Sequence, residues 1–168
     1  MRFRTSAVFP VGFLLVLVGA FAAANDKLEL RARLTGFEEV PPISTTGRGD
    51  FRAEVKDDEI EFRLRYSELQ GGSVVGAHIH FAQRGVNGAI VVHFCGTGGK
   101  PACPPAPATL EGTITAADVV AVPAQGIGAG ELDEVLRAIR AGRGYVNVHT
   151  IMFPAGEIRG QIRVEDDD

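Results

Sequence analysis

The sequence has few of the residues and patterns that mark common classes of enzyme. Serines are few and no Gly-x-Ser-x-Gly motif is present, which argues against a nucleophilic serine of the hydrolase type. Residues 96–99 (Gly-Thr-Gly-Gly) are glycine-rich, but no Lys-Ser/Thr pair and helix follow, as a phosphate-binding loop requires. Glu157 has no second carboxylate at a spacing typical of an acid/base pair. We therefore expect neither a hydrolase nor a nucleotide-binding protein, and no catalytic residue is assigned.

The chain also has no excess of positive charge. It contains 17 Lys and Arg against 21 Asp and Glu, which gives a formal net charge of −4. Domains that bind nucleic acids neutralise phosphates with clustered lysine and arginine. No basic stripe with interleaved aromatic residues occurs in this chain. We therefore expect no nucleic-acid partner.

Cysteine is scarce, and its two copies lie close together. Cys95 and Cys103 flank a segment rich in glycine and proline. In an exported protein, an even number of cysteines with a flexible loop between them predicts a disulfide. The alternative is a pair of thiolate metal ligands, which we favour less because the spacing is loose and the compartment of an exported protein is oxidising.

The only long uncharged hydrophobic run lies at the N-terminus. Arg2 and Arg4 precede residues 5–24, which carry no charge and end in three alanines. This pattern predicts a secretory signal peptide over residues 1–24 and a secreted or periplasmic mature chain over residues 25–168, with no membrane association after cleavage. A retained membrane anchor is the alternative, because the run is about as long as a thin bilayer requires. No cysteine follows the cleavage site, which argues against a lipid anchor.

Most of the mature chain alternates apolar and polar residues at a period of two, the pattern of half-buried β-strands. About eight short strands with turn signals between them predict an all-β fold, an antiparallel sandwich of Greek-key type, with a core over residues 28–164 and a solvated acidic tail over residues 165–168. The expected strands are residues 28–34, 49–55, 60–66, 76–81, 89–95, 109–115, 144–150 and 156–164.

One helix is expected in this β-rich chain. From Gly130 onward, four apolar residues fall on one helical face, and Gly142 is placed to end the helix. The four are Leu132, Val135, Leu136 and Ile139. We expect this short amphipathic helix to pack as a lid over one end of the sandwich. Before it, Thr115 and Asp118 have the spacing of a capping box, which predicts a short helical turn.

All four histidines lie in expected strands: His78, His80, His93 and His149. Successive side chains of a strand point to opposite faces of its sheet. If the apolar neighbours of each histidine point into the core, all four histidines share the opposite face, provided that their strands lie in one sheet. The turn signal Asn87-Gly88 predicts that the first two of these strands form a hairpin.

This arrangement supports two hypotheses. The first is a copper or zinc site made by His78, His80, His93 and His149, since neutral imidazole suits both metals. Glu157 would be a further ligand or an acceptor beside the ligands. The order of histidines also resembles the copper side of copper/zinc superoxide dismutases, although the zinc-side ligands with their aspartate are not recognisable. Only this hypothesis requires a cofactor, which would be copper or zinc.

The second hypothesis is a metal-free polar network, and from the sequence we favour it. Imidazoles can donate and accept hydrogen bonds, a carboxylate accepts them, and a guanidinium can bind a carboxylate through two N–H groups. The geometry separates the two hypotheses: ring nitrogens that converge on one point favour a metal, and rings that bond to the polar neighbours favour the network. The network would comprise His78, His80, Asn147, His149, Glu157 and Arg159.

Several motifs, taken in order, resemble the CHRD domain, the module named after the chordin family. The matching segments are residues 77–80, 87–88, 95–103, 114–119, 124–126, 145–150 and 154–161. This resemblance implies an immunoglobulin-like β-sandwich or barrel. It also implies a binding or structural module without an established catalytic activity, whose partner would be an unidentified protein or surface ligand.

The sequence departs from the CHRD pattern at three positions. Phe81 and Ala89 stand where glycine and proline are expected. His93 stands where many relatives carry an apolar residue. A site with four histidines is therefore not implied by the resemblance.

Overall fold

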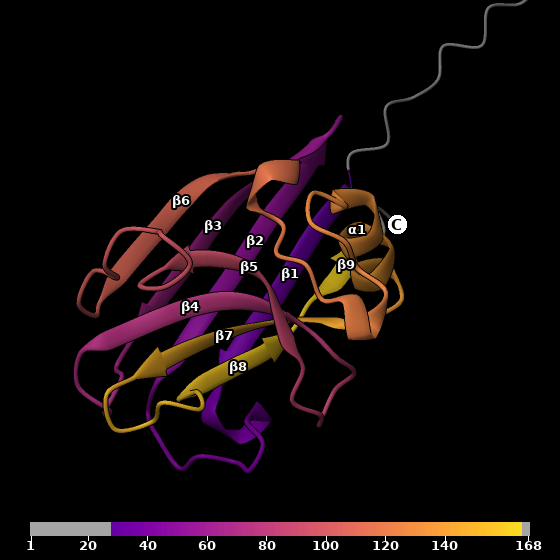
Figure 1. Cartoon of the computed structure of the whole chain (residues 1–168). Helices are drawn as coiled ribbons and strands as arrows, with labels where there is room; N and C mark the ends of the chain where they lie inside the picture. The colour runs from indigo at the N-terminus through magenta and orange to yellow at the C-terminus, as the bar shows by residue number, and fades with distance from the viewer. Residues whose placement is uncertain (1–27, 166–168) are drawn as a thin grey trace, which may run out of the picture.

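The computed structural model describes residues 28–165, and Figure 1 shows their arrangement. The expected signal peptide and the last three residues of the acidic tail lie outside the described residues. The described strands are β1 (Leu28–Thr35), β2 (Arg48–Lys56), β3 (Glu59–Ser67), β4 (Val74–Phe81), β5 (Ala89–Cys95), β6 (Ala108–Ile114), β7 (Gly144–Thr150), β8 (Ile158–Gln161) and β9 (Arg163–Glu165). The described helix is α1 (Leu132–Arg140), and short 3-10 turns are η1 (Gly36–Glu38), η2 (Ala116–Asp118) and η3 (Pro123–Gln125).

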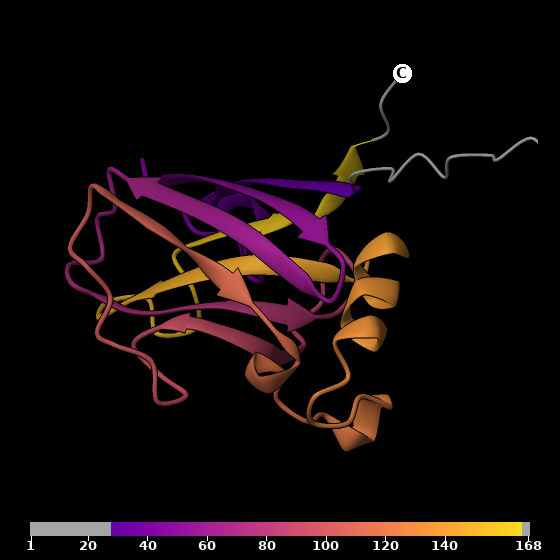
Figure 2. The same ribbon diagram turned by 90° about the horizontal axis from the view of Figure 1, so that it is seen from above.

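The strands form one antiparallel sheet that folds over on itself. Their order is β5-β4-β7-β8-β1-β2-β3-β6, and β9 pairs with β1. The half with β5, β4, β7 and β8 lies against the half with β1, β2, β3 and β6, so the sheet is nearly closed (Figures 1 and 2). The all-β prediction is confirmed, and the structure is consistent with a sandwich or barrel.

The core lies between the two halves of the sheet. Leu34, Phe51 and Leu64 fill it from β1, β2 and β3, and Val146 and Ile158 fill it from β7 and β8. All five are fully buried, and burial of apolar surface is the main stabilising contribution to such a fold. The outer face of β1, β2 and β3 carries exposed ion pairs, which contribute little to stability.

Strands β4 and β7 differ from these because both of their faces are buried. In β4, core residue Ile79 and outward His78 and His80 are all inaccessible to solvent or nearly so. The histidine rings on this outer face form hydrogen bonds with three loop residues, Gly88, Thr97 and Pro154. The polar side of the alternating pattern is therefore covered by loops, and this covered face is where the histidines lie.

The end of the chain differs from the prediction of one strand over residues 156–164. Ile162 interrupts it, because its side chain is fully buried and its N–H donates to the carbonyl of Gly144 at 2.9 Å. Before this residue, β8 pairs with β7, and after it, β9 pairs with β1. The described part of the chain thus has nine strands, because Ile162 separates β8, which lies between β7 and β1, from β9, which pairs with β1 alone.

The helix is confirmed with the expected buried face. Leu132, Val135, Leu136 and Ile139 are its buried residues. Figure 2 shows α1 at one end of the sandwich, where it contacts β7 and β9. Within residues 28–165, no helix is long and apolar enough to cross a membrane.

Two further local predictions are confirmed. Cys95 and Cys103 form a disulfide with a Cα–Cα distance of 5.0 Å, which closes the loop after β5. Thr115 and Asp118 form a capping box at the start of η2, in which the Asp118 carboxylate accepts hydrogen bonds from the backbone and the hydroxyl of Thr115.

Candidate functional site

The four histidines gather on the covered face of β4, β5 and β7. His78 pairs with His93 of β5 and with Asn147 of β7, and it lies between these strands. The centroid of its ring is 4.9 Å from that of His93, 4.8 Å from that of His149 and 5.5 Å from that of His80. The prediction that all four histidines share one face is confirmed, and we call these four residues the histidine cluster.

Two glycines leave room for the rings. A Cβ atom at Gly76 would lie 2.8 Å from Cε1 of His78, and a Cβ atom at Gly98 would lie 2.4 Å from Cδ2 of His93. Contacts this short are not tolerated by real Cβ atoms. Gly76 precedes His78 by two residues on the same face of β4, so strand periodicity could have identified it.

His80 and His149 each bond to a loop carbonyl through Nδ1. The Nδ1 atom of His80 lies 3.1 Å from the carbonyl oxygen of Gly88, and that of His149 lies 3.0 Å from the carbonyl oxygen of Pro154. A carbonyl only accepts, so Nδ1 carries the proton in both rings. In a neutral ring, Nε2 then keeps a free lone pair. Both Nε2 atoms are buried and have no hydrogen-bond partner among the described residues.

His78 has the opposite orientation. Its Nε2 atom lies 2.6 Å from the hydroxyl oxygen of Thr97, while its Nδ1 atom is buried without a partner among residues 28–165. One nitrogen from each of His78, His80 and His149 lies within 4.8 Å of the others. Zinc binds histidine nitrogen at about 2.0–2.1 Å, so side-chain shifts of less than about 1 Å would let all three reach one ion.

Burial keeps these rings neutral. Desolvation lowers the pKa of His78 to about 3 and that of His80 to about 4. Desolvation also lowers the pKa of His93 and of His149. Neutral imidazole is the form that coordinates metals, so the three central histidines can act as ligands at neutral pH without first losing a proton.

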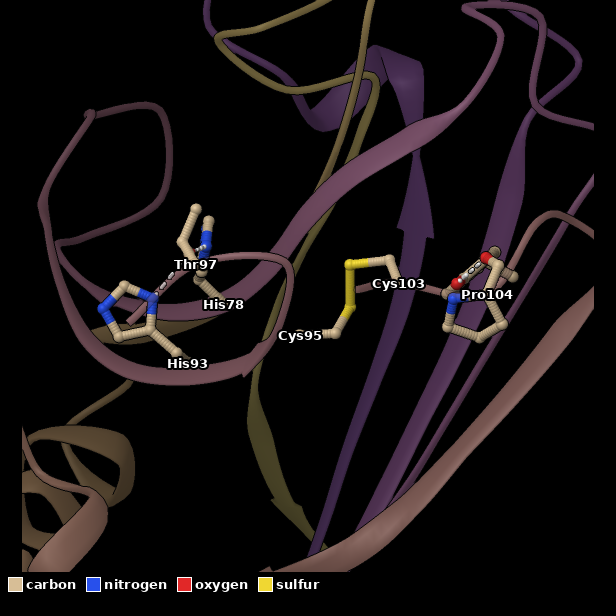
Figure 3. Close-up of a disulfide and its surroundings, with 7 residues drawn as sticks. His78, His93, Cys95, Thr97, Cys103 and Pro104 are labelled. Carbon is tan, nitrogen blue, oxygen red and sulfur yellow. Dashed lines mark hydrogen bonds between the residues drawn. A yellow bond between two sulfur atoms is a disulfide. The ribbon is translucent and has the colours of Figure 1, made fainter. Parts of the chain in front are cut away.

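His93 lies at the edge of the cluster. Its ring is half-buried, and Nδ1 lies 2.8 Å from the same hydroxyl oxygen of Thr97 that contacts His78. Figure 3 shows Thr97 near both rings, on the loop that the disulfide closes. His93 therefore contacts His78, but it is not one of the three residues whose nitrogens converge.

Arg159 lies near the histidine cluster and contacts the ring of Tyr145, which in turn stacks on His80. The rings of His80 and Tyr145 stack with centroids 4.8 Å apart and planes 6° apart. The guanidinium carbon of Arg159 lies 3.5 Å from the centroid of the Tyr145 ring. Because β7 lies between β4 and β8, Tyr145 separates His80 from Arg159. The nearby cation also contributes to the lowered pKa of His80.

Glu157 bonds to groups other than the histidines. One carboxylate oxygen accepts hydrogen bonds from the Thr45 hydroxyl at 2.7 Å and the Gln70 backbone N–H at 2.6 Å. The other accepts from the Gly71 backbone N–H at 3.0 Å and the Thr150 hydroxyl at 2.9 Å. Its carboxylate is fully buried, and both oxygens are occupied by these four donors.

Asn147 and Arg159, the other expected polar neighbours, also bond elsewhere. The Asn147 amide donates to a carboxylate oxygen of Glu39 at 2.6 Å, and Arg159 donates to the side-chain oxygen of Asn87 at 3.0 Å. We call Glu39, Asn147, Thr150, Glu157 and Arg159 the carboxylate cluster. None of the hydrogen bonds found among residues 28–165 joins it to a histidine ring.

Glu39 and Thr97 were not identified from the sequence. Glu39 is 5 % exposed, and desolvation outweighs the attraction of Arg159, so its pKa is raised to about 7. Both residues lie in loops, where no periodic pattern indicates which side chains turn inward. Each of them bonds to a buried residue on a strand elsewhere in the chain, and this contact is visible only in the folded structure.

The fold is thus that of a small antiparallel β-sandwich module with a disulfide-closed loop over a histidine-rich face. A family model for the CHRD domain matches residues 30–162, and the chain belongs to the CHRD domain family. Comparison with curated proteins and comparison with solved structures gave no match. The predicted family is confirmed, and it supports a structural or binding module.

Proposed function

We propose that this CHRD domain is a binding module for a copper or zinc ion, held by His78, His80 and His149. Two observations carry the proposal: one nitrogen from each of the three rings lies within 4.8 Å of the others, and each ring has a buried nitrogen without a hydrogen-bond partner among the described residues. A buried polar atom that loses its hydrogen bond costs about 1–3 kcal/mol. A shared ion would satisfy all three lone pairs at once.

The partners of the other ring nitrogens support the same proposal. Histidine ligands usually donate their second ring N–H to a carbonyl, a carboxylate or water, which fixes the ring orientation. His80 and His149 make this bond to the carbonyls of Gly88 and Pro154. The metal-free network would instead need bonds from the rings to Asn147, Glu157 or Arg159, whose observed bonds go elsewhere.

The donor set favours particular metals. Three neutral imidazoles suit copper and zinc, whereas calcium and magnesium prefer oxygen ligands. Three protein ligands leave a fourth position for water or a small molecule, as in catalytic rather than structural zinc sites. A redox activity would follow only if copper is the ion, and we propose none for zinc.

Metal titration tests the proposal directly. Protein treated with a chelator should take up one equivalent of Cu(II) or Zn(II), measured by calorimetry and by elemental analysis after desalting. His149→Gln, which keeps the ring site polar, should abolish stoichiometric uptake, and His93→Ala should serve as the control histidine that still permits it. Failure of the wild-type protein to take up either metal would leave the histidines as a structural polar face.

We also propose that the protein is exported as a mature chain starting at Asn25. The N-terminal sequence pattern supports this, as do the disulfide and the occurrence of CHRD domains in extracellular proteins. Sequencing the N-terminus of protein recovered from the extracytoplasmic fraction tests it. A chain that still begins at Met1 would indicate a retained anchor or no export. The proposed partner beyond the ion is an unidentified protein or surface ligand.

A further inference from the structure

Thr97 lies at a branch point in the hydrogen bonds of the histidine cluster. Its hydroxyl oxygen is 2.6 Å from Nε2 of His78 and 2.8 Å from Nδ1 of His93. A hydroxyl has a single proton, so it can donate to at most one of the two rings and accepts from at least one of them. The direction of these two bonds therefore decides which nitrogen of His78 carries a proton.

In the first arrangement, Nε2–H of His78 donates to Thr97, and Thr97 donates to Nδ1 of His93. The Nδ1 atom of a neutral His78 then carries a lone pair, as the Nε2 atoms of His80 and His149 do. Three lone pairs face one another, which is the arrangement that a metal ion requires.

In the second arrangement, both bonds run the other way. Nδ1–H of His93 donates to Thr97, Thr97 donates to Nε2 of His78, and the proton of His78 moves to Nδ1. This N–H faces the lone pairs of His80 and His149 and can donate to one of them after a small shift. The second arrangement therefore suits the metal-free protein.

We infer that Thr97 is a positioning residue that sets the tautomer of His78 and so permits metal binding; this inference rests on the proposed function. Conversion from the second arrangement to the first needs no net protons. The Thr97 proton passes to Nε2 of His78, the Nδ1 proton of His93 passes to Thr97, solvent supplies a proton to Nε2 of His93, and Nδ1 of His78 releases one to solvent. The ring of His93 is half-buried, so these proton transfers can exchange with water at His93.

The loop that carries Thr97 is fixed at several points. The Cys95–Cys103 disulfide closes it, and the backbone N–H of Gly96 donates to the carbonyl of Pro101 at 2.7 Å. Lys100 pairs with Asp118 of η2 at 2.6 Å. These links hold the hydroxyl beside the two rings, although the Thr97 side chain lies on an exposed segment.

Two substitutions of Thr97 test the inference. Thr97→Val removes the hydroxyl at nearly constant volume, and Thr97→Ser restores it. We expect Thr97→Val to weaken Zn(II) binding by about 10–100-fold, the usual loss when a residue that orients a ligand is removed. Thr97→Ser should bind within about threefold of the wild type. Thr113→Val, at an exposed position of β6, is the matched control and should bind normally.

Nitrogen-15 NMR of the histidine rings provides a readout that a merely structural role would not change. In the wild type, Zn(II) should move the proton of His78 from Nδ1 to Nε2, while His80 and His149 keep theirs on Nδ1. Wild-type protein that binds no zinc would overturn the proposed function, and this inference with it. Wild-type protein that binds zinc no more tightly than Thr97→Val would overturn the inference alone and leave the proposed function standing.

Discussion

The histidine cluster and the carboxylate cluster both hold polar side chains largely away from solvent but differ in how their polar atoms are satisfied. Both oxygens of Glu157 accept two hydrogen bonds each from the protein itself. In contrast, three ring nitrogens of the histidine cluster are buried without partners within residues 28–165. Both clusters are polar and buried, so burial alone does not distinguish a structural cluster from a binding site.

The difference indicates separate roles. The buried carboxylate of Glu157 accepts hydrogen bonds from Thr45, Gln70, Gly71 and Thr150. It therefore joins segments that lie far apart in the sequence, and it needs no ligand. Buried ring nitrogens without partners destabilise the empty site, and a ligand that binds them relieves that cost. We therefore expect the carboxylate cluster to control folding and the histidine cluster to control binding.

The largest expected effect is on folding stability. Glu157→Gln replaces an accepting oxygen with an NH₂ group that faces two buried donors, so we expect it to lower the free energy of unfolding by about 3 kcal/mol or more. His149→Gln should lower the stability of the metal-free protein by only about 1 kcal/mol, because it loses the single hydrogen bond from Nδ1 to the Pro154 carbonyl and its Nε2 atom has no partner among the described residues. Urea unfolding with a chelator present measures both. Equal losses in the two variants would show that the histidine cluster is as structural as the carboxylate cluster.

The pH dependence of stability separates the clusters by sign. The lowered pKa values of His78 and His80 mean that the unfolded chain binds more protons than the native protein below about pH 6.5, so stability falls as the pH falls toward 4. The raised pKa of Glu39 has the opposite effect, since the native protein binds the extra proton between pH 4.5 and about 7 and stability falls as the pH rises.

Glu39→Gln isolates the second contribution. The amide oxygen can still accept the hydrogen bond from Asn147, but the side chain no longer titrates. Relative to wild type, the variant should gain up to about 3 kcal/mol as the pH rises from 4.5 to 7, as the shift of the Glu39 pKa requires. Urea unfolding across this range measures the difference. Parallel curves for the two proteins would show that Glu39 is already charged in the native state.

Metal should stabilise only those forms of the protein in which the histidine cluster is intact. At a free ion concentration of 100 times Kd, binding to the native state alone stabilises it by about 2.7 kcal/mol. Zn(II) should therefore raise the unfolding temperature of the wild type, should leave that of His149→Gln unchanged, and should raise that of Thr150→Val, a carboxylate-cluster variant with intact histidines. Protection of His149→Gln equal to that of wild type would place the ion at another site.

Much of the fold and part of the site follow from strand periodicity. A period of two assigns each side chain to a face, so the common face of His78, His80 and His149 could be predicted once their strands were expected to pair. The buried face of α1 follows in the same way from the helical period. The disulfide could be expected because its two cysteines are the only pair in the chain.

The contacts that determine chemistry could not be predicted in this way. Thr97, Gly88 and Pro154 reach the rings from loops, where no period relates a residue to a face. Glu39 binds Asn147 from 108 positions away in the sequence. The break at Ile162 depends on which strands lie beside it. In each case the contact depends on a residue that only the tertiary structure brings close, and the local sequence does not indicate it.

The smallest expected effect concerns His93 and decides between three ligands and four. Without the His93 ring, the Thr97 hydroxyl can still accept from Nε2–H of His78, so the lone pair of His78 stays directed at the ion. We expect His93→Ala to weaken Zn(II) binding less than tenfold, about 1.4 kcal/mol at most, measured by competition with a chromophoric chelator. Thr97→Val should weaken binding more than this, because it removes the acceptor itself. If His93→Ala instead loses zinc as fully as His149→Gln, His93 turns inward as a fourth ligand, and the four-histidine site expected from the sequence is the correct one.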